Sequence, residues 1–345
     1  MKFSKYTLSD LATIKYGKNQ KKVLSPDGLI PILGAGGLMG YATTALYNKP
    51  SVLIGRKGTI GKVKYVEQSF WTVDTLFYTI VNTDLVVPKY LYYVMSLIDL
   101  NNYNEGTTIP SLRTETLNRL EFDIPSLEDQ KKILSCLNPI DEKIELNNKI
   151  NNNLEQQAQA IYCDMFITNV NPSWQLGCLS DLITVRYGKD HKKLADGIYP
   201  VYGSGGIMRY VEKPLYDKES VLIPRKGTLN NVMYVNKPFW SVDTMFFTEM
   251  KLPNVAKFVF HFVKSKDLAS LNAGSAVPSM TTDILNAMEL SIPDADTFYK
   301  FENIVVPLYQ AMQQNTQESS KLAELRNSLL PRLMSGEIDV ADINL

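Results

Sequence analysis

The stretch SVLIGRKGT at Ser51–Thr59 returns as SVLIPRKGT at Ser220–Thr228. On either side of it, further segments recur in the same order in both halves of the chain. They are LSDLATIKYGK (Leu8–Lys18) with LSDLITVRYGK (Leu179–Lys189), PILGAGGLM (Pro31–Met39) with PVYGSGGIM (Pro200–Met208), FWTVDTLF (Phe70–Phe77) with FWSVDTMF (Phe239–Phe246), and GTTIPSL (Gly106–Leu112) with GSAVPSM (Gly274–Met280). The chain is therefore a tandem duplication in which one repeat is a whole domain.

Each half has two compositional zones. The first zone, residues 1–125 and 172–293, is rich in Gly, Pro and aromatic residues, with short apolar runs typical of strands. The second zone, residues 126–171 and 294–345, contains almost no Gly and is rich in Leu, Ile, Glu, Gln and Asn, which favours a long helix. We therefore expect an α+β protein with two tandem α/β domains, each followed by a helical spacer.

Both helical zones carry apolar residues at heptad spacing, which predicts that the helices pair as a coiled coil. The positions expected to make this pairing are Ile133, Ile140, Ile144, Asn147, Leu154 and Ile161 in the first helix, and Phe301, Leu308, Met312, Asn315, Leu322 and Leu329 in the second. Ser319 and Arg326 interrupt the pattern. An amphipathic helix lying on its own domain is the alternative.

The same helices contain matched special residues. Asn147 and Asn315 occupy equivalent heptad positions, and a buried Asn in such a seam can fix the register. Pro139 and Pro307 also match, and we expect each to start or kink its helix, with Asn138 as the N-cap of the first. Because the first helix leads from domain one to domain two, a paired second helix must run back. The pairing would then be antiparallel, with an internal pseudo-twofold axis.

Composition excludes several classes of protein. With 36 basic and 36 acidic residues the formal net charge is zero, so any nucleic-acid binding must come from local clusters. Three cysteines without a C-x-x-C pattern and only two histidines argue against a disulfide framework and a metal site. The first residues lack the apolar core of a signal peptide, and the apolar runs are too short to predict a membrane span. We expect a cytoplasmic protein.

Local clusters of cations do occur, at equivalent places in the two copies. They follow the YGK segments and occupy the RKG turns, where loops containing Gly can approach phosphates closely. The candidate DNA-binding residues are Lys18, Asn19, Gln20, Lys21, Lys22, Arg56, Lys57, Thr59 and Lys62 in the first copy, and Lys189, Asp190, His191, Lys192, Lys193, Arg225, Lys226, Thr228, Asn230 and Asn231 in the second. A solvated surface is the alternative interpretation.

No motif predicts a catalytic centre. The GAGG and GSGG turns lack the rest of a dinucleotide-binding fingerprint. Asn138-Pro139-Ile140 and Asn171-Pro172-Ser173 fail at the third position of the N-P-P-[FYW] motif of amino-methyltransferases. Asp129-Gln130-Lys131 could imitate a nuclease D-x-K motif, but it is absent from the second copy.

Taken together, these segments resemble the specificity subunits of type I restriction–modification enzymes. The resemblance covers nearly the whole chain and is carried by the PILGAGGLMGY and PVYGSGGIMRY turns, the GRKGTIGKV and PRKGTLNNV loops, and IPSLEDQKKILSCLNPIDEKIE. It implies a non-catalytic subunit that reads a two-part target in double-stranded DNA and docks two methyltransferase subunits and restriction subunits. The chain itself would carry no cofactor, because the methyl donor and ATP would belong to those partners.

Two other functions remain open at this point. The chain could be a stand-alone methyltransferase or nuclease with unrecognised motifs, which methylation assayed with this chain alone would reveal. It could instead be a coiled-coil scaffold that binds protein, for which no sequence-preferring DNA binding is expected.

The duplication predicts the symmetry of the target. Two similar domains related by a twofold axis would read inverted half-sites, as in an interrupted palindrome. The copies differ beside their basic loops: Asn19-Gln20 becomes Asp190-His191, Gly61-Lys62 becomes Asn230-Asn231, and Thr43-Thr44 becomes Glu212-Lys213. These side chains present different donor and acceptor patterns to base edges, so the half-sites should differ at one or more positions. Loop drift without consequence is the alternative. Changing Asp190-His191 to Asn-Gln should make the second half-site more like the first, as seen by methylation mapping. Native half-sites without inverted similarity would contradict the symmetry.

Overall fold

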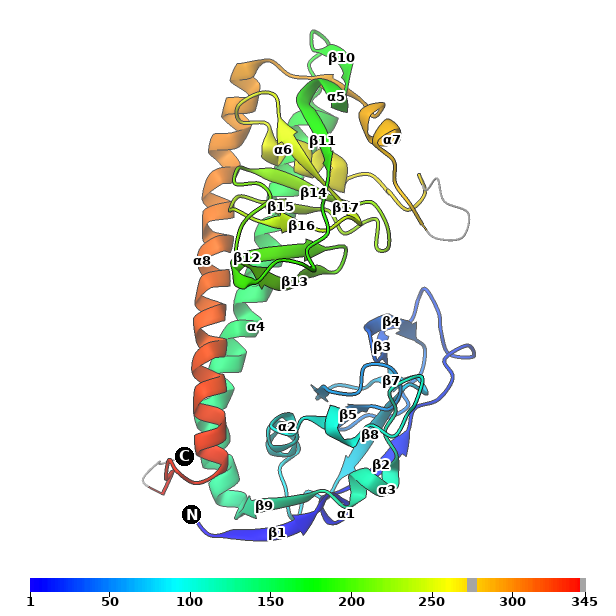
Figure 1. The fold of residues 1–345 in the computed structure, drawn as a ribbon, viewed down its shortest axis with the longest axis vertical. Coiled ribbons are helices and arrows are strands. Elements are labelled where there is room, and N and C mark those ends of the chain that lie inside the picture. Colours follow the sequence, from blue (N-terminus) through cyan, green and yellow to red (C-terminus); the bar gives the residue numbers. More distant parts are fainter. Residues whose placement is uncertain (272–277, 342–345) are drawn as a thin grey trace. The chain divides into compact units, whose positions relative to one another are not determined.

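The computed structural model describes residues 1–271 and 278–341 and divides the chain into two compact units. Unit 1 comprises Met1–Leu146 and Gln317–Leu345, and unit 2 comprises Asn147–Thr316. Each unit contains one α/β domain and parts of two long helices, α4 (Leu127–Cys163) and α8 (Ala295–Met334) (Figure 1). The predicted fold class is confirmed: two tandem α/β domains, each followed in sequence by a long helix.

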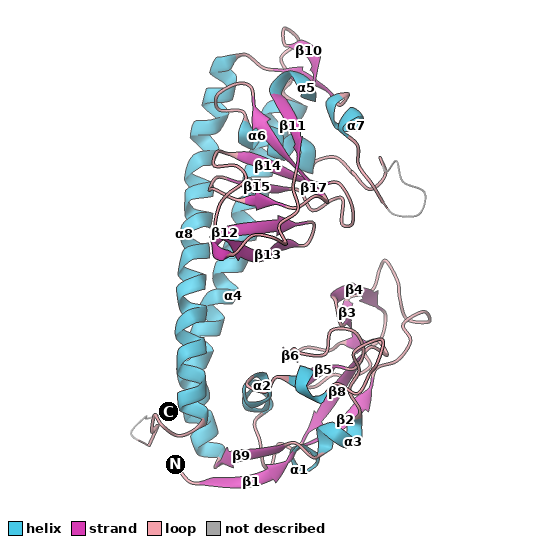
Figure 2. Cartoon of the chain, viewed as in Figure 1, coloured by secondary structure: helices cyan, strands magenta, loops and turns pink. Residues whose placement is uncertain are grey.

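The α/β domain of unit 1 is built from three small sheets (Figure 2). The central sheet is antiparallel, with the order β2 (Ala12–Tyr16), β8 (Leu76–Val81), β5 (Ser51–Gly55) and β6 (Val63–Val66). A second sheet contains β4 (Gly37–Ala42), β3 (Ile30–Gly34) and β7 (Trp71–Thr72). The third is the pair of β1 (Phe3–Thr7) and β9 (Glu121–Pro125). Its short helices are α1 (Leu8–Leu11), α2 (Pro88–Ser96), η1 (Leu100–Tyr103) and α3 (Thr114–Asn118).

Unit 2 repeats this topology. The central sheet has the order β11 (Ile183–Tyr187), β17 (Met245–Met250), β14 (Ser220–Pro224) and β15 (Met233–Val235). A second sheet contains β13 (Gly206–Val211), β12 (Asp196–Gly203) and β16 (Trp240–Ser241). The third is the pair of β10 (Gln175–Cys178) and β18 (Glu289–Ile292). Its helices are η2 (Asp164–Thr168), which continues α4, then α5 (Leu179–Leu182), α6 (Ala256–Lys264) and α7 (Thr282–Asn286). Of the repeated GSAVPSM segment, residues 274–277 lie outside the described residues.

The central strands form because their apolar runs are buried. Every residue of β5 and of β14 is buried, so both faces of these strands are covered. The buried hydroxyl of Ser51 donates to the carbonyl of Thr79 at 2.8 Å, and the Thr79 hydroxyl accepts from the backbone N–H of Val52 at 2.9 Å. Ser220 and Thr248 repeat the first bond at 2.8 Å. These bonds satisfy polar groups that burial would otherwise penalise.

Each unit completes its hydrophobic core with both long helices. In unit 1, Ile133 and Leu137 from the start of α4 belong to the same buried cluster as Leu330 and Leu333 from the end of α8. In unit 2, the cluster takes residues from the opposite ends, including Ala158 and Tyr162 of α4 and Phe301 and Val305 of α8. Within each unit the two helices are therefore antiparallel partners, and each also packs on the α/β domain.

The long helices begin earlier than their prolines predicted. Ser126 precedes α4, and its hydroxyl accepts from the backbone N–H of Asp129 at 3.1 Å. Asp294 precedes α8 and accepts from the N–H of Thr297 at 2.7 Å. Both are N-caps of the ordinary kind. The helices run through both prolines, so the expectation that Pro139 and Pro307 start their helices, with Asn138 as a cap, is wrong. The other expectation, that the prolines kink the helices, stays a prediction.

The predicted domain boundaries stay predictions. The helices start close to residues 126 and 294, where the composition changes, but the compact units each take part of both helices.

None of the predicted helix-pairing positions is exposed. In unit 2, Asn147 is fully buried and its side-chain amide donates to the carbonyl of Asn315 at 3.3 Å, while the Asn315 amide donates to Asn151 Oδ1 at 2.9 Å. The matched Asn residues thus form a polar layer between the helices.

Arg326, which interrupts the heptads, has a structural role in unit 1. Its guanidinium donates to Asp141 Oδ1 at 2.9 Å across the helix pair. Asp141 also accepts from the hydroxyl of Tyr93 and lies 3.8 Å from the Lys89 ammonium, and both of these residues belong to α2. Arg326 and Asp141 therefore join the two helices to the α/β domain. Within the described part of the chain, no helix is long and apolar enough to cross a membrane.

Unit 2 fixes α6 to the long helices through the fully buried His261. Its Nδ1 lies 2.8 Å from Gln159 Oε1, an acceptor, so Nδ1 carries the proton and Nε2 accepts from the Tyr309 hydroxyl at 3.0 Å. Burial first, and then the nearby Lys264 charge, lower the pKa of His261 to about 3. The imidazole is therefore neutral in the folded protein at neutral pH.

This histidine should make unit 2 less stable in acid. The unfolded chain binds a proton near the ordinary histidine pKa of 6.5, whereas the folded chain does not until about pH 3, so stability is lost as the pH falls through this range. Between pH 6.5 and 5 the loss should reach about 2 kcal/mol. Urea unfolding across this range measures it, with His261→Gln as the variant that should show a flatter dependence. Equal pH dependence in both proteins would contradict the assignment.

Candidate nucleic-acid interface

The register of the central sheet brings the predicted basic segments to one edge. Strands β2 and β5 both pair antiparallel with β8, so they run parallel to each other and end at the same edge. Tyr16, the last residue of β2, pairs with Phe77, and Gly55, the last of β5, pairs with Leu76. The YGK loop, the RKG turn and the turn before β8 therefore meet. The same pairing of β11 and β14 with β17 gives unit 2 an equivalent edge.

Backbone contacts hold the YGK loop against the turn before β8. In unit 1 the N–H of Lys18 donates to the carbonyl of Thr72 at 2.8 Å, and the indole of Trp71 donates to the carbonyl of Lys18 at 2.9 Å. A Cβ on Gly17 would lie 2.0 Å from the carbonyl oxygen of Val73, so only glycine permits this approach. Unit 2 has the same indole bond, from Trp240 to Lys189 at 2.9 Å.

The RKG turn is fixed from two sides. The N–H of Arg56 donates to Thr75 at 2.9 Å, and the carbonyl of Arg56 accepts from Leu112 at 3.0 Å. Gly58 has a φ of 82°, a left-handed conformation that suits glycine, and its N–H donates to Pro110 at 2.9 Å. In unit 2 the turn repeats, with Gly227 at a φ of 88° and the carbonyl of Arg225 accepting from Met280 at 2.9 Å.

The predicted DNA-binding residues are all at least partly exposed, as a surface that contacts a ligand requires. Their cations form no ion pair with any described residue, whereas many cations elsewhere are paired. Arg186, for example, lies just before Tyr187 and pairs with Glu249 at 3.0 Å. The basic loops therefore carry charge that the protein itself does not neutralise, and an anionic ligand could do so.

The polar residues proposed to read bases differ in the hydrogen bonds that their side chains already form within the protein. Asn19 and Asp190 make equivalent turns, in which the side-chain oxygen accepts from the N–H two residues on, at 2.9 Å and 3.1 Å. The backbone N–H of Lys192 is the main cause that lowers the pKa of Asp190. Asn230 bonds to Asp267 at 3.0 Å and Asn231 to the carbonyl of Ser204 at 2.8 Å. Both amides of the second loop are thus engaged within unit 2.

The residues that organise these loops are not among the predicted site residues. Tyr16, Trp71 and the backbone of Thr72 in unit 1, with their counterparts in unit 2, position the basic segments. A signal for them exists in the repeat, because YGK and FW-x-VDT occur in both copies. Repetition alone does not separate them from residues of the core, since their proximity to the cations follows from strand pairing rather than from spacing.

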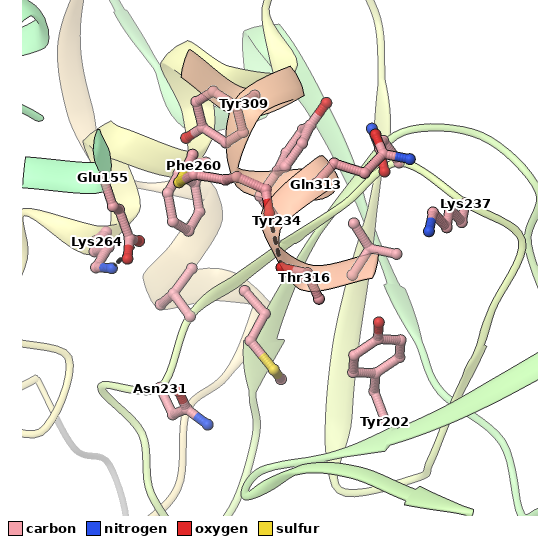
Figure 3. Close-up of a pocket in the computed structure, with 15 residues that line it drawn as sticks. Glu155, Tyr202, Asn231, Tyr234, Lys237, Phe260, Lys264, Tyr309, Gln313 and Thr316 are labelled. Carbon is pink, nitrogen blue, oxygen red and sulfur yellow. Dashed lines mark hydrogen bonds and ion pairs between the residues drawn. The ribbon is translucent and has the colours of Figure 1, made fainter. Parts of the chain in front are cut away.

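Unit 2 also contains a cavity of about 470 Å³ between β15 and the long helices, shown in Figure 3. Its aromatic walls include Tyr234, Phe260 and Tyr309, and Lys264 in its lining pairs with Glu155. Lys264 is therefore neutralised, whereas Lys237, also in the lining, forms no ion pair with any described residue. Among the described residues there is no cluster of His, Cys, Asp or Glu suited to hold a metal ion. In the Asp129-Gln130-Lys131 segment, Gln130 is buried and accepts from the N–H of Val87, while Asp129 bonds to Ser126 at the start of α4.

Comparison with known proteins matches most of the chain to one family. A family model described as "Type I restriction modification DNA specificity domain" matches residues 2–156 and again residues 171–321. The MjaIX type I restriction enzyme specificity subunit of Methanocaldococcus jannaschii is 23% identical over 346 aligned positions, and the match covers 86% of this chain and 80% of that protein. The HindI type I restriction enzyme specificity subunit of Haemophilus influenzae is 22% identical, with coverages of 81% and 84%.

A solved structure has the same fold. The crystal structure of an S subunit of a type I restriction–modification system from M. genitalium matches with a TM-score of 0.55 and 20% identity, covering 96% of each chain. The likeness extends over both α/β domains and both long helices.

The close approach of Gly17 to Val73 can be tested by substitution. Gly17→Ala should destabilise unit 1 by about 1–3 kcal/mol, because the added methyl group would overlap a backbone oxygen that cannot easily move. Gly36→Ala is the matched control, since nothing lies within 4 Å of a Cβ there. Urea unfolding of both variants measures the difference, and an equal loss would refute the contact.

Proposed function

The chain belongs to the type I restriction modification DNA specificity family, and we propose that each of its two units reads one half of a two-part DNA target. The protein is the DNA-recognition subunit of such a system, and catalysis lies in partner subunits. The two half-sites would be separated by a spacer whose bases are not read. Family membership does not favour a stand-alone enzyme or a protein-binding scaffold.

One observation carries the assignment of the DNA-contacting surface. In both units the same sheet edge presents the YGK loop and the RKG turn, and the cations there have no ion-pair partner among the described residues. Phosphate neutralisation by Lys and Arg supplies much of the affinity of proteins for DNA. A chain with no net charge can therefore bind DNA only where such local cations gather. The basic loops meet this requirement in both units.

The proposal includes the rest of the assembly. Specificity subunits of this family work with methyltransferase and restriction subunits and with DNA. We propose two methyltransferase subunits for this chain, one for each unit, with restriction subunits joining them. The methyl donor and ATP would be bound by those partners, and the complex would act on DNA in the cytoplasm.

The decisive experiment maps methylated adenines in DNA treated with the partner methyltransferase subunits, with and without this chain. Methylation at a two-part sequence that requires the chain would support the function. Methylation at the same sequence without the chain would refute it, as would methylation by the chain alone.

Removal of an unpaired cation should weaken binding to all DNA sequences alike. Arg225→Ala should lower affinity uniformly and reduce the slope of log K against log salt by about 1, as expected for a phosphate contact. Fluorescence anisotropy with target and non-target duplexes, across a salt series and with the methyltransferase partners bound, measures both quantities.

Arg186→Ala is the matched control, because this neighbouring arginine is already paired with Glu249. Its removal should change the salt slope little. A changed target preference in Arg225→Ala at an unchanged salt slope would make Arg225 a base reader instead. Equal effects of the two substitutions would show that the unpaired charge is not what matters.

A further inference from the structure

Each unit stacks the arginine of its RKG turn on the tyrosine that ends the first strand of the central sheet. In unit 1 the guanidinium carbon of Arg56 lies 5.0 Å from the centre of the Tyr16 ring. In unit 2 the corresponding distance, from Arg225 to Tyr187, is 5.4 Å. Both are within the range of a cation–π interaction. The two stacks are the same arrangement built twice.

The tyrosine is held by the sheet and not by the arginine. Tyr16 packs in a T-shaped contact on the fully buried Phe77, with ring centres 5.0 Å apart and planes at 75°. Tyr187 packs on Phe246 at 5.0 Å and 68°. About half of each tyrosine is exposed, at 51% and 53%. The ring therefore forms a fixed platform at the surface, beside the basic loops.

The arginine is anchored along one edge only. Nη1 of Arg56 donates to the backbone carbonyl of Asp74 at 2.9 Å, and Nη1 of Arg225 donates to that of Asp243 at 3.2 Å. Neither guanidinium forms an ion pair with a carboxylate in the described ranges. Arg carries five N–H donors in a rigid fork that matches the oxygens of a phosphate. The platform and the single anchor leave most of these donors available.

We infer that Tyr16 and Tyr187 are positioning residues, which hold Arg56 and Arg225 in the orientation that binds a DNA phosphate. This inference rests on the proposed function. A free arginine side chain loses rotamer freedom when it binds, and a stack that fixes it beforehand reduces that loss. Because the two units repeat the stack while nearby residues differ, the contact serves affinity in both half-sites and does not read sequence.

A double-mutant cycle tests the inference in the full chain with its methyltransferase partners bound to the mapped target duplex. Tyr16→Leu should weaken binding about two- to fivefold, the size expected for an exposed cation–π contact. Tyr16→Phe keeps the ring and should stay within about twofold of the native protein. In an Arg56→Ala background, Tyr16→Leu should cause no further loss and no further change in salt slope.

The outcomes separate this inference from the proposed function. A Tyr16→Leu loss that is the same in the Arg56→Ala background, or a Tyr16→Phe loss as large as that of Tyr16→Leu, would overturn the positioning role while leaving the phosphate contact intact. No effect of Arg56→Ala itself would instead refute the phosphate contact, and the inference with it. Thermal unfolding checks that the variants fold. The Tyr187 and Arg225 pair in unit 2 repeats the cycle independently if a unit 1 variant does not fold.

Discussion

The hydrophobic core of each unit is closed by helix ends that come from distant parts of the chain. Unit 1 buries Ile133, near the start of α4, in the same cluster as Leu333, near the end of α8. Unit 2 buries Tyr162 of α4 with Phe301 of α8. Burial of apolar area is the main favourable contribution to folding, so neither α/β domain reaches its full core without both helices. The return of α8 to the first domain is therefore a requirement of stability.

The polar groups at the helix seam set which residues face each other. Asn147 and Asn151 of α4 bond to Asn315 and Met312 of α8, and Arg326 meets Asp141 in unit 1. Buried polar groups lose free energy unless they are hydrogen-bonded, and a shift by one heptad would separate the side-chain pairs Asn315–Asn151 and Arg326–Asp141. Apolar contacts tolerate several alignments, whereas these bonds fit one. These polar residues therefore fix the register of the helix pair, although they contribute little hydrophobic area.

Comparison of the two units separates the contacts that position the basic loops, which both units share, from the side chains that differ between them. The shared features are backbone contacts and stacks, such as the indole bonds of Trp71 and Trp240 and the tyrosine platforms under Arg56 and Arg225. The residues that differ include Gly61, whose counterpart Asn230 bonds to Asp267. A side chain with internal bonds is less free to read a base. Gln20 and His191, which also differ and are partly exposed, are the better candidates for sequence reading.

Residue order alone is enough to predict the duplication, the alternation of α/β domain and helix, the heptad seam with its matched Asn residues, and the basic loops. Each of these is a local pattern along the chain. The helix starts predicted from the sequence are wrong, because Pro139 is a conspicuous signal whereas the caps at Ser126 and Asp294 are ordinary polar residues. That the YGK loop and the RKG turn share an edge emerges from the folded chain, since it depends on both strands pairing with β8. The fold likewise places Tyr16 under Arg56 and engages Asn230 and Asn231 internally, because contacts between residues far apart in sequence leave no spacing signal.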